Sequence, residues 1–289
     1  MRSVAGKTVL VTGAAMGLGR LFAKKAVAED ASAVVLWDID EPALKETSAE
    51  LGAAGGTVLS YAVDVASAEA VTVAAAQVRK AVGTVHVLVN NAGIVRGNGY
   101  FWETSSVADI EQTMTTNALA PMFLTREFLP GMIESGSTCR ILNIASAAGL
   151  VPNPRMAVYA ASKWAAVGWS DSVRLELEQA GHRHVKVTTV CPTYIRTGMF
   201  EGVRRILLTP MLDPEPVVDD AWTQMLRGRP FLIIPWTTRV NRVLSGLLPI
   251  KVRDVYLDRA GVFHSMDGFT GHQDPGRPGL TEVGPREDH

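Results

Sequence analysis

Seven short runs rich in Val, Leu and Ile recur along the chain, and segments of helical length separate most of them. The runs are apolar on both faces, as strands are in a parallel sheet that helices cover on both sides. This alternation favours an α/β fold with a doubly wound parallel sheet and right-handed crossovers. The predicted strands are residues 8–11, 33–37, 58–63, 85–90, 140–144, 185–190 and 231–235, and the predicted helices include 17–29, 41–51, 67–82, 108–134 and 155–179.

The length of 289 residues suits one large domain. We predict a single domain over residues 1–262, with a loop that covers the substrate at about 194–216. Residues 268–289 are rich in Gly, Pro and charge and lack helical or strand periodicity. We therefore predict an irregular C-terminal tail over residues 263–289.

The composition limits the kinds of partner and the cellular compartment that we expect for this chain. The net charge is -1, so the overall balance does not favour nucleic acid. Cys139 and Cys191 lie inside apolar runs and are interpreted as buried hydrophobes, with neither a disulfide framework nor a metal site. We see no secretory signal and no run of about 18 apolar residues, and we expect a cytoplasmic protein.

A glycine-rich turn follows the first predicted strand and reads Thr12-Gly13-Ala14-Ala15-Met16-Gly17-Leu18-Gly19. Gly13 permits the tight turn, and Gly17 and Gly19 let a pyrophosphate approach the N-terminus of the next helix. The spacing differs from that of the general dinucleotide fingerprint. We expect Gly13, Met16, Gly17, Leu18 and Gly19 to contact a nicotinamide dinucleotide.

Asp38 ends the second predicted strand, 19 residues after Gly19. A carboxylate near this offset accepts hydrogen bonds from the adenosine ribose and repels a 2′-phosphate, which predicts NAD over NADP. We place Ile39 in the same site. The alternative is that Asp38 and Asp40 only cap the following helix. At the ends of the third and fourth strands, Asp64, Val65, Asn91, Ala92 and Gly93 complete the predicted nucleotide site.

Tyr159 and Lys163 are four residues apart in a predicted helix and therefore share one face. A nearby ammonium favours the phenolate, so we expect Lys163 to lower the pKa of Tyr159 and make it a general base, assisted by the positive nicotinamide of the oxidised cofactor. Ser146 follows the fifth predicted strand, from where its hydroxyl could position the substrate oxygen.

Asn117 has a separate physical signal. Pro121 lies four residues later and has no N–H, so the carbonyl of Asn117 loses its usual helical partner. That carbonyl could hold a water that leads protons from Lys163 to solvent. The alternative is a plain proline kink with Asn117 on the surface.

Taken together, these residues resemble the short-chain dehydrogenase/reductase family, from about residue 7 to residue 235. The motifs that carry the resemblance are Thr12-Gly13-x3-Gly17-x-Gly19, Asp64, Asn90-Asn91-Ala92-Gly93, Asn117, Ser146, Tyr159-x3-Lys163 and Pro192. The resemblance implies a Rossmann-like sheet of seven strands and NAD(P)-dependent redox of alcohol and carbonyl groups. It also implies a proton relay through Asn117, Ser146, Tyr159 and Lys163, cofactor contacts from Tyr159 and Lys163, and a homodimer or homotetramer built through the long helices near 108–134 and 155–179.

One position departs from the family pattern. The family usually has Pro-Gly after the sixth strand, and this chain has Pro192-Thr193. We still assign Pro192, Ile195 and Thr197 to the cofactor, the last two beside the nicotinamide carboxamide. Pro-Thr resembles the branch that contains retinol dehydrogenases and hydroxysteroid dehydrogenases.

The predicted substrate walls are apolar. One is Tyr100-Phe101-Trp102, and the other is the loop 194–216 with Met199, Phe200, Val203, Ile206, Leu207, Leu208, Met211 and Leu212. They favour a steroid, retinoid, terpenoid or long-chain alcohol, or the matching carbonyl compound. The alternative is that these side chains pack against each other or a partner subunit.

The segment 221–262 has seven Lys and Arg against two Asp, a balance of 7 − 2 = +5. It also contains Trp222 and Trp236, as a helix that lies on an anionic membrane would. We favour instead a subunit interface or a solvated helix that packs on the core.

The leading hypothesis is an NAD-dependent dehydrogenase that acts on an apolar alcohol, with Tyr159 as general acid and base. The alternatives are an NADPH-preferring carbonyl reductase and a nucleotide-binding scaffold without turnover. The presence of all four relay residues argues against the scaffold.

Overall fold

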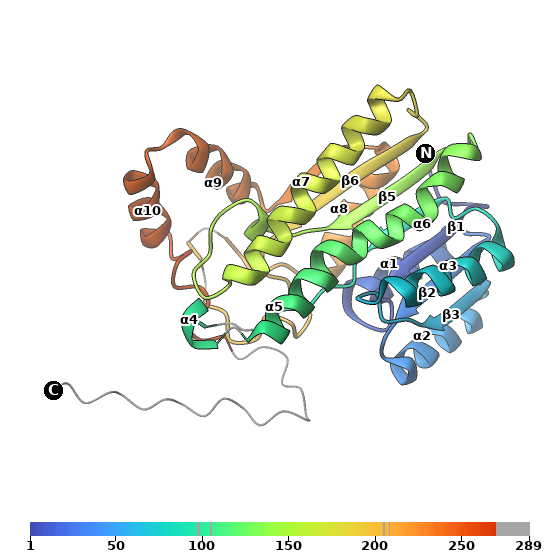
Figure 1. Ribbon diagram of the computed structural model, residues 1–289, viewed down its shortest axis with the longest axis horizontal. Helices are drawn as coiled ribbons and strands as arrows, with labels where there is room; N and C mark the ends of the chain where they lie inside the picture. The colour runs from blue at the N-terminus through green and yellow to red at the C-terminus, as the bar shows by residue number, and fades with distance from the viewer. Residues whose placement is uncertain (97–98, 105, 205, 208, 270–289) are drawn as a thin grey trace.

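The computed structural model describes residues 1–96, 99–104, 106–204, 206–207 and 209–269. Seven parallel strands form one sheet in the order β3-β2-β1-β4-β5-β6-β7 (Figure 1). The predicted fold class is confirmed, and every predicted strand end lies within two residues of the observed one. The strands are β1 (Thr8–Thr12), β2 (Ala33–Asp38), β3 (Val58–Ala62), β4 (Val87–Asn90), β5 (Cys139–Ile144), β6 (Val185–Pro192) and β7 (Phe231–Ile234).

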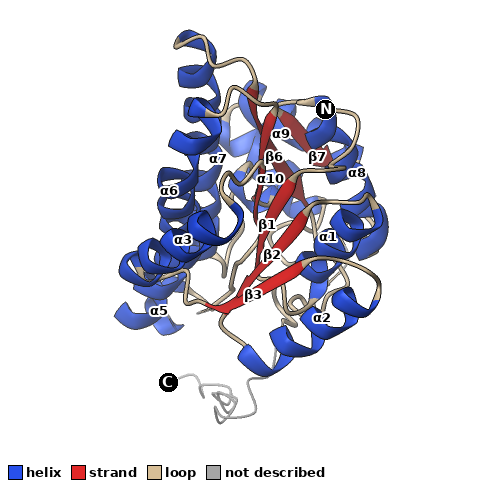
Figure 2. Cartoon of the chain, turned by 90° about the vertical axis from the view of Figure 1, so that its right-hand side faces the viewer, coloured by secondary structure: helices blue, strands red, loops and turns tan. Residues whose placement is uncertain are grey.

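Helices cover both faces of this sheet (Figure 2). One face packs on α1 (Gly17–Ala28), α2 (Glu41–Ala53) and α8 (Pro214–Arg227). The other packs on α3 (Ala68–Val82), α6 (Ala120–Glu134) and α7 (Ala157–Gln179). Each layer buries a continuous apolar cluster, which explains why the strands are apolar on both sides. Trp222 of α8 is part of the first cluster, where it stacks on Phe22 and is 1% exposed, so it cannot contact a membrane.

The helix predicted at 108–134 is interrupted. It consists of α5 (Val107–Met114), a π-helical turn (Thr115–Leu119) and α6. The amide of Ala120 donates to the carbonyl of Thr115, five residues back, and Pro121 has no amide hydrogen to donate. The proline thus explains why the ordinary helical ladder changes at Asn117.

The carboxyl ends of the strands meet at one edge of the sheet. The connections of β1 and β4, which are neighbours, leave towards opposite faces, and this divergence opens a crevice at that edge. The loops after β1, β2, β4, β5 and β6 carry most of the predicted site residues. The fold therefore brings together segments that are more than 100 residues apart in the chain.

The C-terminal part adds a helical hairpin of α9 (Trp236–Leu247) and α10 (Ile250–Arg259), which projects from the body of the molecule (Figure 1). The short helix α4 (Phe101–Thr104) lies before α5. The predicted substrate loop ends earlier than expected, because α8 begins at Pro214. Residues 263–269 form turns with Ser265 and Met266 buried, while the rest of the predicted tail lies outside the described residues.

Candidate active site

The glycine-rich turn lies between β1 and α1, and the side chain of Asn91 holds it in place. The Asn91 amide donates to the carbonyls of Thr12 at 2.9 Å and of Gly13 at 3.2 Å. Gly13 has φ +63°, and a Cβ on Gly19 would lie 1.9 Å from the Gly13 carbonyl oxygen. Glycine is therefore required at Gly19 by contact between two backbone segments.

The N-terminus of α1 suits an anionic group. Its N-cap residue, Met16, makes no side-chain hydrogen bond to the helix, and the first turn contains no acidic residue. The first backbone amides of a helix need acceptors and carry partial positive charge. A dinucleotide pyrophosphate supplies such acceptors, so this turn fits the predicted cofactor.

The structure separates the roles of Asp38 and Asp40. Asp40 is the N-cap of α2 and accepts from the amide of Ala43 at 3.1 Å. Asp38 instead accepts from the amide of Ala15, in the glycine-rich turn, at 2.9 Å. The Asp38 carboxylate therefore lies beside the glycine-rich turn, whereas Asp40 is the residue that caps the following helix. Ile39 is 70% exposed next to it.

The segment after β4 connects the glycine-rich turn to the predicted relay residues. The amide of Ala92 donates to the Thr12 hydroxyl at 3.1 Å. A Cβ on Gly93 would lie 3.2 Å from Asn117 Oδ1 and 3.5 Å from Lys163 Nζ. After β3, Val65 is buried and Asp64 is exposed, with its carboxylate accepting from the amide of Ala66.

The loop after β6 lies over the same turn. A Cβ on Gly17 would lie 3.9 Å from the side chain of Thr197, so Thr197 faces the start of α1. Ile195 is buried and pairs with Leu212 in a short β-bridge. Pro192 is the last residue of β6. This arrangement brings the predicted carboxamide contacts to the crevice.

Tyr159 and Lys163 lie in the first two turns of α7, and Ser146 follows β5. Lys163 Nζ is 5.6 Å from the centre of the Tyr159 ring and donates to the Ile144 carbonyl at 3.1 Å. The three side chains are buried or nearly so, with Ser146 the most exposed at 9%. The fold thus brings these predicted relay residues into one group.

Burial changes the expected electrostatics of this group. Desolvation raises the pKa of the Tyr159 phenol well above its ordinary value, and the neighbouring Ser146 hydroxyl offsets only part of the rise. Desolvation also lowers the pKa of the Lys163 ammonium to about 8. The sequence predicted a lowered pKa for Tyr159. Among the protein's own groups, desolvation outweighs the effect expected of Lys163, because removal from water disfavours the charged form of both side chains.

The lowered pKa of Lys163 makes a testable contribution to stability. Between pH values of about 8 and 10.5 the unfolded chain binds this proton and the folded protein does not, so stability rises with pH across that window. We expect wild type to gain thermal stability relative to Lys163→Met over this range in cofactor-free melting experiments. Lys80→Met, at an exposed position on α3, is the control. Parallel pH dependences of wild type and Lys163→Met would contradict the assignment.

Asn117 is 2% exposed, so the surface alternative for this residue is wrong. Its side chain accepts from the amide of Ile94 and donates to the carbonyl of Ile94, both at 2.9 Å. It also donates to the hydroxyl of Ser162 at 3.1 Å. Asn117 thereby joins the interrupted helix to the loop after β4 and to α7. The predicted water at its carbonyl stays a prediction.

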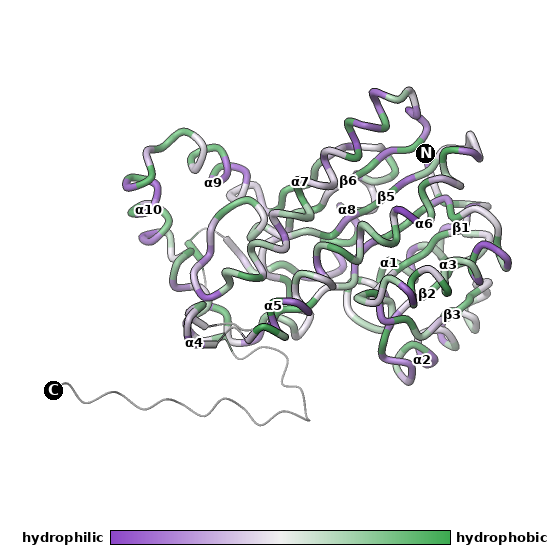
Figure 3. The backbone as a smooth tube through the Cα atoms, viewed as in Figure 1, coloured by the Kyte–Doolittle hydropathy of each residue, from purple (hydrophilic) through white to green (hydrophobic). Residues whose placement is uncertain are grey.

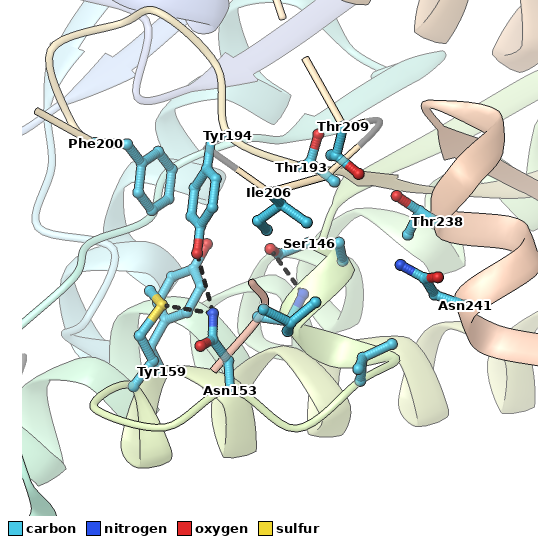
Figure 4. Close-up of a pocket in the computed structure, with 15 residues that line it drawn as sticks. Ser146, Asn153, Tyr159, Thr193, Tyr194, Phe200, Ile206, Thr209, Thr238 and Asn241 are labelled. Atoms are coloured by element: carbon cyan, nitrogen blue, oxygen red, sulfur yellow. Dashed lines mark hydrogen bonds between the residues drawn. The ribbon is translucent and has the colours of Figure 1, made fainter. Parts of the chain in front are cut away.

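A pocket of about 550 Å³, counting the space at its open mouth, lies beside Ser146 and Tyr159 (Figure 4). Most of its wall is apolar. The lining residues are Ser146, Ala147, Ala148, Val151, Asn153, Met156, Tyr159, Thr193, Tyr194, Phe200, Ile206, Thr209, Thr238, Asn241 and Val262. The loop after β6 thus supplies part of the wall, as predicted.

The predicted wall at Tyr100, Phe101 and Trp102 does not line this pocket, and all three side chains are exposed. Tyr100 stacks on Trp102, and the guanidinium of Arg155 lies 4.4 Å from the Tyr100 ring centre. Leu208, part of the other predicted wall, lies outside the described residues.

Several lining residues were missed from the sequence. Thr238 and Asn241 belong to α9, within the segment interpreted as a subunit interface or a solvated helix that packs on the core, and Asn153 lies in the loop before α7. The Asn153 amide and the Tyr194 hydroxyl are hydrogen-bonded at 3.0 Å. The hydroxyl of Thr193 is buried in the wall with no hydrogen-bond partner among the described residues. Nothing in local periodicity marks these positions as neighbours of Tyr159.

Cys139 and Cys191 are both buried and unpaired, and burial raises the pKa of each thiol. Within the described ranges, no group of three or more His, Cys, Asp or Glu side chains could hold a metal ion.

A family model described as short chain dehydrogenase matches residues 7–206, and the chain belongs to this family of oxidoreductases that act on CH–OH groups. It is 38% identical to epidermal retinol dehydrogenase 2 of Mus musculus over 94% of this chain and 88% of that protein. It is 34% identical to estradiol 17-beta-dehydrogenase 11 of Rattus norvegicus over 94% of this chain and 89% of that protein. The predicted branch is thus confirmed.

Two solved structures support the same fold. A short chain dehydrogenase/reductase from Burkholderia phymatum in complex with NAD superposes with a TM-score of 0.76 and 30% identity, over 86% of this chain and 96% of that one. A metagenomic short-chain oxidoreductase in complex with NADP gives a TM-score of 0.67 and 31% identity, over 80% and 97%.

Proposed function

We propose that this protein interconverts an apolar alcohol and its ketone or aldehyde, with NAD(H) as the cofactor and Tyr159 as the general acid and base. The observation that carries the proposal is that Ser146 and Tyr159 line one apolar pocket. Retinol and estradiol, the alcohols in the names of two relatives, are both apolar and agree with such a pocket.

Each residue has a distinct task in this proposal. The nicotinamide, when bound, supplies the hydride acceptor or donor. Ser146 donates to the substrate oxygen and holds it near Tyr159. Tyr159 takes the alcohol proton during oxidation and returns one during reduction. Lys163 holds positive charge next to the phenol, and Asn117 keeps the loop after β4 against α7.

The raised pKa of Tyr159 bears on which direction of the reaction the phenol is ready to catalyse. A neutral phenol is ready to donate a proton but must first lose one to act as a base. Oxidation therefore needs additional positive charge close to the phenol, such as that of an oxidised nicotinamide ring, to favour the phenolate.

The substrate class is tested by the initial rate of NADH formation across a panel of alcohols. The panel contains steroid, retinoid, terpenoid and long-chain aliphatic alcohols, with small polar polyols for comparison. We expect the highest kcat/KM for an apolar alcohol, because the pocket offers few polar groups. Better turnover of polyols would contradict the apolar assignment.

Cofactor preference tests Asp38. Its carboxylate lies against the phosphate turn, where it would bind ribose hydroxyls and repel a 2′-phosphate. We expect NADH to be used at least about tenfold better than NADPH, and Asp38→Ala to reduce this ratio. Glu46→Ala, on α2, is the control. A preference of wild type for NADPH would favour the carbonyl reductase alternative.

A further inference from the structure

Helix α9 is amphipathic, but its orientation is the reverse of the usual one. Its inward side carries mainly polar residues, Thr237, Thr238, Asn241 and Ser245, beside the half-buried Leu244, and Thr238 and Asn241 line the pocket. A surface helix normally turns its apolar stripe to the core. Here a polar stripe faces inward, so the apolar stripe must face out.

The outward stripe consists of Trp236, Val240, Val243 and Leu247, which follow the spacing of one helical face. They are 68%, 40%, 58% and 76% exposed. Ile250 and Val255 of α10 are also exposed, at 67% and 50%. Hydrophobic and hydrophilic residues alternate along this projecting hairpin (Figure 3). An exposed apolar stripe of this kind indicates a binding partner.

The charge of the hairpin is positive. Residues 236–259 contain five Arg and Lys against two Asp, a balance of 5 − 2 = +3, and α9 itself has Arg239 and Arg242 and no acidic residue. Both acids lie in α10, where Asp254 pairs with Arg253 and Asp258 with His264. Arg239, Arg242 and Lys251 are exposed, although the Arg239 Nε also donates to the Ile233 carbonyl and Arg242 lies over the Phe231 ring. A second copy that presented this surface to itself would bring cations together, whereas anionic lipid headgroups would complement them.

We infer that the outward face of α9 and α10 docks on an anionic phospholipid surface. Trp236, Val243 and Leu247 would enter the boundary between headgroups and acyl chains, and the arginines would contact lipid phosphates. None of the described helices is both long and apolar enough to cross a bilayer. Because the opposite side of α9 lines the pocket, docking would place the pocket near a lipid source of apolar substrate; this last consequence rests on the proposed function.

Vesicle co-sedimentation tests the surface with the full chain. The probes are phosphatidylcholine vesicles with and without phosphatidylserine, at low and high salt. We expect binding to the vesicles that contain phosphatidylserine and weaker binding at high salt. Val243→Asp should lower the partition coefficient by about tenfold or more, because it places a charge in the stripe. No binding by wild type would overturn the inference.

Val73→Asp is the matched control, because Val73 is 54% exposed in the middle of α3 and lies outside the proposed surface. It should bind vesicles as wild type does; equal losses in the two variants would overturn the inference. Sedimentation velocity measures the oligomeric state and so tests a second copy of this chain as the alternative occupant of the face. If wild type did not bind vesicles and Val243→Asp formed a smaller oligomer than wild type, the face would be assigned to a second copy. The vesicle-binding assay needs no substrate, so a lack of binding would not contradict the proposed function. Likewise, a lack of turnover across the alcohol panel would not contradict the proposed docking surface.

Discussion

Tyr159→Phe should lower kcat for alcohol oxidation by about a hundredfold to ten-thousandfold, the range that a positioned acid–base group contributes. The substitution removes only the hydroxyl. The ring that remains can keep its edge-on contact with Phe200, at 6.3 Å between ring centres. Folding and cofactor binding should therefore change little. The measurements are initial rates, NADH fluorescence titration and thermal melting.

Tyr61→Phe is the control for this prediction, because Tyr61 lies in β3, away from the pocket. It should turn over as wild type does. If Tyr159→Phe kept turnover within tenfold of wild type, Tyr159 would not be the acid–base group. If turnover were lost while the cellular role of the protein was unchanged, the scaffold alternative would gain support.

Gly19→Ala should abolish measurable NADH binding at cofactor concentrations that saturate wild type. The added Cβ would lie 1.9 Å from the Gly13 oxygen and 2.8 Å from Asn91 Nδ2. Backbone cannot rotate away as a flexible side chain can, so the turn must rebuild and lose the hydrogen bonds from Asn91. We also expect destabilisation of about 1–3 kcal/mol, typical of overpacking.

The control for Gly19→Ala is Gly52→Ala, near the end of α2. No heavy atom lies within 4 Å of a Cβ at Gly52, apart from its own helix and chain neighbours. Alanine favours helix, so this variant should be neutral or more stable by up to about 1 kcal/mol. Normal NADH binding by Gly19→Ala would refute the close-packed turn.

The sequence predicted the strands well because strand formation leaves a local signal. Runs such as β1 and β2 have apolar, buried residues on both faces, as a sheet covered by two helical layers requires. The prediction of the helix at 108–134 was less complete. The sequence shows that Pro121 lacks an amide hydrogen, but it does not show the π-helical turn that accommodates the proline. How a helix absorbs a proline depends on what packs around it.

The grouping of Ser146, Tyr159 and Lys163 was also predictable from sequence, because the carboxyl ends of parallel strands meet at one edge and Tyr159 and Lys163 share a helical face. Their protonation was not identifiable. The expectation of a lowered Tyr159 pKa counted the positive charges of Lys163 and of the oxidised nicotinamide but not burial, and among the protein's own groups desolvation is the largest effect. Burial depends on Phe200 and Met266, which pack near Tyr159 from remote parts of the chain.

By itself, the sequence determined the sheet, the phosphate turn and the order of the relay residues, since each depends on local periodicity or on short spacings. Tertiary structure alone decided which side chains complete the pocket and which way α9 faces. Helical periodicity shows that α9 has an apolar stripe and a polar stripe, but not which one meets the protein. Here Thr238 and Asn241 face inward because they line the pocket, and Val243 and Leu247 are consequently left on the outside.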